Sequence, residues 1–201
     1  MLIYRLATPA PAIWNVLKTL VLIALFDAIV VWGVPTLILL VQHADTGLDP
    51  FFPPQIEVGE AILAVSTVLV VWAGLMLAIK GGGTPLSLDA PRRLVITGPY
   101  AWFRTPMVTG TLGQVIGVGL IGGSVIVVLL VPVIAVLWNT IIRPTEEDVM
   151  QHLFGRGFEL YRRSVRCWLP MRSPWKPPPE FGPFALSGLP EKGSRQWRRR
   201  R

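Results

Sequence analysis

The chain has 201 residues, of which 52% are hydrophobic and 15% are charged, and its formal net charge is +7. Soluble domains carry about 25% charged residues, so this composition excludes an ordinary soluble domain and indicates that lipid contacts much of the surface. The single cysteine excludes an internal disulfide, and no cluster of Cys and His residues has the spacing of a metal site. The positive charge flanks apolar segments without a nucleic-acid motif, so it predicts contact with anionic lipids and no nucleic-acid binding.

The N-terminal part of the chain contains two apolar runs. Ile13 to Val41 exceeds the ~20 residues needed to cross a bilayer, and no small-residue cleavage site follows it, so we expect a retained span. Pro35 predicts a kink or an end in this helix. A polar, Pro-rich loop over 45–54 leads to a second span over about Glu60 to Ile79. Asp27 is costly inside an apolar span, so we expect it to be functional or to have a polar partner in the bundle.

A third apolar region, Met107 to Ile142, is too long for one span. Gly122-Gly123-Ser124 interrupts it, which favours a tight hairpin of two helices over about 108–121 and 125–142. Small residues at helical spacing let membrane helices approach closely. The first helix of the hairpin carries four of them: Gly110, Gly113, Gly117 and Gly119.

A different kind of helix follows the hairpin. Apolar residues from Val149 to Val165 recur at helical spacing while charged residues fill the other face, and Thr145 is a candidate N-cap. This pattern is typical of an amphipathic helix at the membrane surface or against the bundle. Beyond Pro170 the chain is rich in Pro, Gly and Arg, and we expect a mostly disordered basic tail.

The distribution of basic residues predicts the orientation of the spans. The loop between the first two spans has no Lys or Arg, whereas basic residues lie between the second and third spans and after the fourth. The positive-inside rule then places both termini in the cytoplasm and the tip of the hairpin outside. The predicted fold is an all-α, polytopic transmembrane bundle of about four spans, with a helical hairpin and a C-terminal amphipathic helix.

Two polar segments flank the hairpin and contain the strongest functional signal. The first reads Gly98-Pro99-Tyr100-Ala101-Trp102-Phe103-Arg104-Thr105-Pro106-Met107-Val108-Thr109-Gly110, and the second contains Glu146-Glu147, Phe154-Gly155, Tyr161, Val165 and Trp168-Leu169-Pro170. Together, over about residues 81–170, they resemble the isoprenylcysteine carboxyl methyltransferase family and the related phospholipid methyltransferases. Thr105 stands where that family usually has His, and Val108 where it usually has Tyr.

The resemblance implies an integral membrane enzyme that binds S-adenosylmethionine in a pocket capped by the C-terminal helix. Glu146 or Glu147 would pair with the cofactor's amino group or offset its sulfonium charge, and Arg104 would pair with its carboxylate as a planar fork. Transfer to an amine or hydroxyl would need a proton acceptor, Glu147 or His152, whereas transfer to a carboxylate would not. We expect Arg104 and Glu147 to be catalytic, and the residues implied in cofactor binding are Gly98, Tyr100, Arg104, Pro106, Gly110, Glu146, Glu147, Phe154, Gly155 and Tyr161.

The predicted organisation has three parts: two N-terminal spans over 1–80, a methyltransferase-like region over 81–170, and the basic tail over 171–201. The expected acceptor is a lipid or a small lipophilic molecule, and the expected location is a bacterial inner membrane. Two other functions stay open. One is an NADPH-dependent membrane reductase of similar C-terminal architecture, although such reductases are usually much longer. The other is a non-catalytic membrane scaffold, which the departures at Thr105 and Val108 favour. The sequence does not indicate an oligomeric state.

Overall fold

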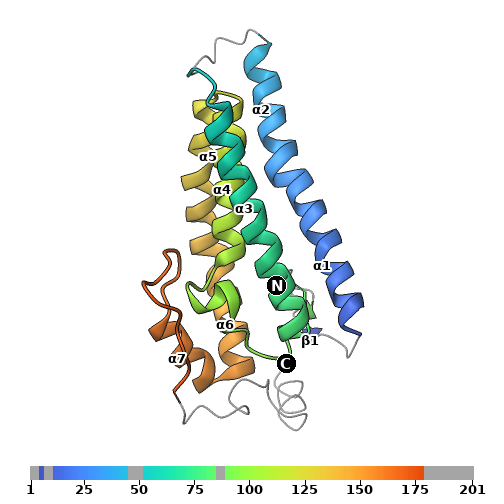
Figure 1. The fold of residues 1–201 in the computed structure, drawn as a ribbon, viewed down its shortest axis with the longest axis vertical. Coiled ribbons are helices and arrows are strands. Elements are labelled where there is room, and N and C mark those ends of the chain that lie inside the picture. Colours follow the sequence, from blue (N-terminus) through green and yellow to red (C-terminus); the bar gives the residue numbers. More distant parts are fainter. Residues whose placement is uncertain (1–4, 7–10, 45–51, 85–88, 179–201) are drawn as a thin grey trace. The chain divides into compact units, whose positions relative to one another are not determined.

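The computed structural model describes residues 5–6, 11–44, 52–84 and 89–178, and almost all of its regular structure is helical (Figure 1). The predicted loop at 45–54 is described only from residue 52, and most of the predicted tail, residues 179–201, lies outside the described residues. One short parallel pair joins β1 (Arg5–Leu6) to β2 (Asp89–Ala90). The helices, in chain order, are α1 (Ala12–Asp27), η1 (Ala28–Gly33), α2 (Val34–His43), α3 (Ile56–Met76), η2 (Leu77–Gly81), η3 (Gly98–Ala101), α4 (Pro106–Ile121), α5 (Val125–Leu137), η4 (Trp138–Ile142), α6 (Arg143–Phe154) and α7 (Arg156–Ser164).

Three helical runs are long and apolar enough to cross a membrane, and α4 is a shorter apolar helix. The long runs are Ala12–His43, Ile56–Gly81 and Val125–Phe154, and the apolar part of the last one ends at Ile142. The prediction of an all-α polytopic bundle is therefore confirmed. The 16 residues of α4 give a length of about 24 Å, less than the ~30 Å of hydrocarbon in a bilayer.

The first run does not end at Pro35. The π-helical segment η1 precedes this proline, which lies in the first turn of α2, and helix continues to His43. Proline lacks an N–H and its ring clashes with the carbonyl four residues earlier, and a wider π turn relieves that conflict. The chain therefore keeps one continuous span across a residue that usually breaks a helix.

The chain divides into two compact units, which we describe separately. The bundle unit comprises residues 20–74 and 105–143, and the motif unit comprises the described residues within 1–19, 75–104 and 144–178. The two glutamates, Arg104 and the Gly98–Ala101 turn all belong to the motif unit. Pro106 and Gly110 belong to the bundle unit.

In the bundle unit, α4 is the inner helix, and its glycines set how closely its neighbours approach. A Cβ atom at Gly117 would lie 2.8 Å from the Gly59 carbonyl oxygen and 2.9 Å from Leu63 Cβ, both on α3. Gly119 faces α5 in the same way, against Val127 and Val128. Direct backbone contact of this kind is how membrane helices gain packing energy when lipid offers no hydrophobic driving force between them.

The hairpin turn falls at the predicted position. Gly123 has φ +63°, a conformation that glycine adopts without strain, and Ser124 caps α5 by accepting a 3.2 Å hydrogen bond from the Val127 N–H. The Ser124 hydroxyl also donates to Gln42 Oε1 at the end of α2. The turn therefore ties α2 to the α4–α5 hairpin through a fully buried hydroxyl.

Asp27 has a polar partner in the bundle, which is one of the two expectations for it. Gln114 Nε2 donates to Asp27 Oδ2 at 3.1 Å and to Thr67 Oγ1 at 3.1 Å, so one amide joins α1, α3 and α4. Thr67 in turn donates to the Leu63 carbonyl at 2.8 Å. Polar side chains inside an apolar bundle are costly unless they bond to one another, so the network offsets part of the cost of the aspartate in α1. Within the described residues, Asp27 Oδ1 and Gln114 Oε1 are buried without a hydrogen bond.

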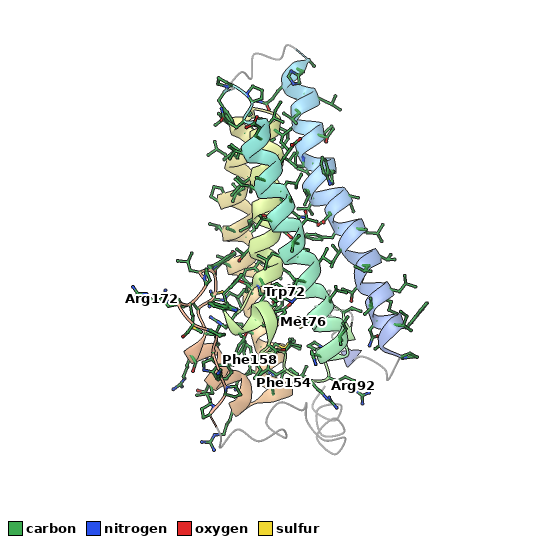
Figure 2. The ribbon with its side chains drawn as sticks, viewed as in Figure 1. Trp72, Met76, Arg92, Phe154, Phe158 and Arg172 are labelled. Carbon is green, nitrogen blue, oxygen red and sulfur yellow. The ribbon has the colours of Figure 1, made fainter. Side chains whose placement is uncertain are left out.

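In the motif unit, Gly155 ends α6 and starts α7. Its φ of +52° breaks the helix that the sequence pattern suggested would run unbroken from Thr145. The helix also begins before the predicted N-cap Thr145, because α6 continues directly from η4 at Arg143. The break turns the labelled Phe154 and Phe158 toward a common core (Figure 2). The buried members of that core are Leu94, Ile96, Phe154, Phe158, Tyr161 and Val165.

We predict that Gly117→Val lowers the thermal unfolding midpoint of the detergent-solubilised protein, because the new side chain meets α3 backbone and overpacking typically costs about 1–3 kcal/mol. Ala64→Val, at an exposed position of α3, is the matched control and should leave the midpoint nearly unchanged. Equal midpoints for the two variants would contradict close α3–α4 packing at Gly117.

Candidate active site

An ion pair between Arg104 and Glu147 joins the two motif segments. Arg104 Nη1 lies 2.6 Å from Glu147 Oε1, and the side chains are only 10% and 18% exposed. Arg104 Nε also donates to the Val165 carbonyl at 3.0 Å. On the other side, Glu147 Oε2 lies 3.4 Å from Arg162 Nη1. Removing one partner of such a shielded pair leaves an uncompensated charge, so the pair constrains both segments strongly.

The turn that precedes Arg104 is held by α7 and by the segment that directly follows α7. Tyr161, on α7, donates its hydroxyl to the Tyr100 carbonyl at 2.7 Å. The Arg104 N–H donates to the Arg166 carbonyl at 2.9 Å. Gly98 begins the turn with φ +63°, where glycine is favoured. The first motif therefore takes its shape from residues about sixty positions later in the chain.

Glu146 differs from its neighbour Glu147 because it has no hydrogen bond or ion pair within the part of the chain that the structure describes. Burial raises the pKa of Glu146 to about 7, and the negative charge of Glu147 adds to the shift. Near neutral pH this carboxyl is therefore close to half protonated. A cation bound beside it would favour the ionised form and release the proton.

The side chains of the two motif tyrosines, Tyr100 and Tyr161, are neutral at physiological pH. Burial is the main cause that raises the pKa of Tyr100 and that of Tyr161 above the ordinary value. Tyr161 is 3% exposed, and its ring packs against Trp175 with the ring centroids 5.6 Å apart. Tyr161 therefore supports the turn through both its ring and its hydroxyl, and Phe154 packs into the same core.

The structure brings most of the predicted site residues into one unit and leaves two in the other. Gly98, Tyr100, Arg104, Glu146, Glu147, Phe154, Gly155 and Tyr161 lie in the motif unit. Pro106 lies at the first position of α4, where its missing N–H has no cost. A Cβ atom at Gly110 would lie 2.6 Å from Val70 Cγ2, so this glycine faces α3.

His152, a candidate base, is on an exposed face of α6. Its Nδ1 lies 2.7 Å from the Asp148 carbonyl oxygen, and its side chain is 60% exposed. In the described part of the chain, no group of three or more His, Cys, Asp or Glu residues could hold a metal ion.

Sequence reasoning did not identify Arg162 or Trp175 as part of the site. Arg162 lies on the charged face of α7, and helical periodicity alone does not predict its ion pair with Glu147 of α6. Trp175 lies in the segment assigned to the basic tail, yet Trp175 and Met171 both pack against the core of the motif unit. An isolated Trp and Met within a Pro-rich stretch were the only available signal.

Comparison with protein families gives a match over the middle of the chain. The model of a family described as phospholipid methyltransferase matches residues 54–157, a little more than half of the chain. The matched segment runs from α3 into α7 and includes Arg104 and both glutamates, but it ends before Tyr161. No curated protein and no solved structure matches the chain.

We predict that Arg104→Lys destabilises the motif unit, because a lysine ammonium cannot reach both Glu147 and the Val165 carbonyl as the guanidinium does. The expected loss is about 1–3 kcal/mol, seen as a lower thermal midpoint. The control is Arg163→Lys, which changes an exposed pair with Glu159 and should have almost no effect. The interpretation of the site fails if both variants unfold at the wild-type temperature.

Proposed function

Because the chain belongs to the phospholipid methyltransferase family, we propose that it uses S-adenosylmethionine to methylate a lipid or a small lipophilic molecule within the membrane. Family membership implies methyltransferase activity, and the apolar helices make the protein an integral, multi-pass membrane protein. The observation that carries the proposal is the Arg104–Glu147 ion pair with the unpartnered carboxyl of Glu146 beside it.

The residues of the motif unit fit the charges of S-adenosylmethionine, which carries a sulfonium cation, an amino group and a carboxylate. Glu146 is a half-buried carboxyl without a protein partner among the described residues, which suits the amino group or the sulfonium. Arg104 uses Nε and Nη1 for protein contacts, and its remaining N–H groups suit the carboxylate. Gly98, Tyr100, Phe154, Gly155 and Tyr161 would shape the surrounding surface, while Pro106 and Gly110 would act through the start and packing of α4.

Glu147 has a different role from Glu146 in this proposal. Two arginines hold its carboxylate, so we assign it to position Arg104 and not to accept a proton. S-adenosylmethionine supplies the electrophilic methyl group when it is bound. The chain's own contribution is to orient cofactor and acceptor, to offset the cofactor's positive charge at Glu146 and to exclude water.

The decisive experiment incubates the purified protein with membrane lipids and S-adenosylmethionine labelled in its methyl group. We expect saturable cofactor binding and label in the lipid fraction. Alkaline treatment then separates methyl esters, which release methanol, from N-methyl, S-methyl and methyl ether groups, which stay attached, and mass analysis of the labelled product identifies the acceptor. A parallel titration with NADPH tests the reductase alternative. Folded protein that binds neither cofactor would support a scaffold.

A pH-dependent prediction follows from Glu146. Below about pH 7 its carboxyl is largely protonated and neutral, while the cofactor's amino group stays protonated. Pairing therefore requires loss of a proton, and affinity for S-adenosylmethionine should rise with pH between 5.5 and 7 by up to about tenfold per unit.

Calorimetry in two buffers of different ionisation enthalpy measures this proton release directly. Glu146→Gln should bind the cofactor more weakly and release no proton. Arg163→Lys, remote from the carboxyl in sequence and exposed, should behave as the wild type does. An unchanged proton release in Glu146→Gln would remove Glu146 from the site.

A further inference from the structure

We infer that residues 165–175 form a strap that holds Arg104 in the geometry needed for cofactor binding, and that Trp175 is a positioning residue for this reaction. The inference rests on the proposed function. The strap begins eight residues after the end of the family match, so nothing in that match assigns a role to it. It has no helix or strand of its own, and its position depends on the contacts it makes.

Hydrogen bonds fasten the strap to the first motif at both of its ends. At the start, the Val165 carbonyl accepts from Arg104 Nε at 3.0 Å, and the Arg166 carbonyl accepts from the Arg104 N–H at 2.9 Å. Further along, the Met171 N–H donates to the Trp102 carbonyl at 3.0 Å. The backbone N–H of Trp175 donates to the Ala101 carbonyl at 2.7 Å. The strap therefore holds both the backbone and the side chain of Arg104.

The Trp175 side chain adds a second connection to the same turn. Its ring lies 5.6 Å from that of Tyr161 at an interplanar angle of 59°, a tilted arrangement that aromatic pairs favour. The Tyr161 hydroxyl in turn donates to the Tyr100 carbonyl. Trp175 is thus connected to the motif turn in two ways: its backbone N–H bonds to Ala101 directly, and its ring packs on Tyr161, which bonds to Tyr100.

Two features suit the segment to act as a fixed strap. Prolines restrict the backbone of the free chain and so reduce the entropy lost when the segment docks. The sequence has prolines in and just beyond the strap at Pro170, Pro174, Pro177, Pro178 and Pro179. The strap also presents exposed charged side chains: Arg166 and Arg172 are exposed, beside the exposed Leu169, and Figure 2 shows the Arg172 side chain directed away from the helices.

The functional consequence is preorganisation of Arg104. When the strap is released, the guanidinium loses its Val165 partner and the first motif loses three backbone hydrogen bonds. Only a fraction of molecules then holds Arg104 in the binding geometry, and apparent affinity falls by that fraction. The bundle unit keeps all of its own contacts, so membrane insertion and helix content should be preserved.

The test compares Trp175→Ala with Arg172→Ala, an exposed residue of the same strap. We expect Trp175→Ala to weaken S-adenosylmethionine binding about tenfold and to raise the KM for it more than it lowers kcat. Trp175→Phe, which keeps an aromatic ring against Tyr161, should restore most of the affinity, and Arg172→Ala should match the wild type. Wild-type affinity in Trp175→Ala would overturn the inference.

Hydrogen exchange of the cofactor-free protein gives a second readout that is independent of the proposed function. Trp175→Ala should speed exchange at the Arg104, Met171 and residue-175 amides and leave the bundle unit protected. If the wild type fails to bind S-adenosylmethionine, the proposed function fails while this readout still tests the strap. If Trp175→Ala does not fold, Trp175→Leu takes its place in the experiment, because leucine keeps the apolar bulk and removes the aromatic ring. Unchanged exchange in the variant that folds would show that Trp175 does not hold the strap.

Discussion

The ion pair between Arg104 and Glu147 is the constraint on which the motif unit depends. It joins residues 43 positions apart, and both side chains are largely shielded from solvent, so each charge relies on the other. The remaining bonds of Arg104 reach Val165 and Arg166, at the C-terminal end of α7. One guanidinium therefore fixes a turn, the start of α6 and the end of α7 relative to one another. A site for a small charged cofactor needs this kind of rigidity, because its groups must be placed before the ligand arrives.

The bundle unit depends on a different constraint, because its helices must pack together although their outer surface is apolar. Large apolar side chains such as Val65 and Val68 are 71% and 67% exposed, whereas Gln114 is 2% exposed at the centre. Moving a valine side chain from lipid into the protein brings no hydrophobic gain. The close approach of α3 to the glycines of α4, such as Gly110 and Gly117, and the Gln114 network therefore hold the helices together. Exposed apolar and buried polar residues in one unit are the arrangement expected of a protein solvated by a bilayer.

The sequence was sufficient to predict the features that depend on local composition. Apolar run lengths predicted the spans, Gly122-Gly123-Ser124 predicted the hairpin turn, and the paired motifs predicted the family, which the family match confirms. Features that depend on backbone geometry or distant contacts were less accessible. Helix continues through Pro35 because a π turn precedes it, and α6 ends at Gly155 because that residue adopts a positive φ. The packing of Trp175 on Tyr161 leaves no periodicity to detect. Membrane orientation stays a prediction from the positive charges.

The contrast between the two adjacent glutamates bears on the departures from the family motif. Successive helical residues point about 100° apart, so Glu146 and Glu147 address different surroundings. Two arginines compensate Glu147, whereas Glu146 keeps a raised pKa and no partner among the described residues. A membrane scaffold would gain stability from replacing such a carboxyl with a neutral side chain, since its burial is costly. Thr105, in place of the motif His, is the N-cap residue of α4, and none of the bonds that hold the Arg104 side chain passes through it. A Thr in place of that His therefore leaves the Arg104–Glu147 ion pair intact, so the departure at this position does not count against the proposed methyltransferase.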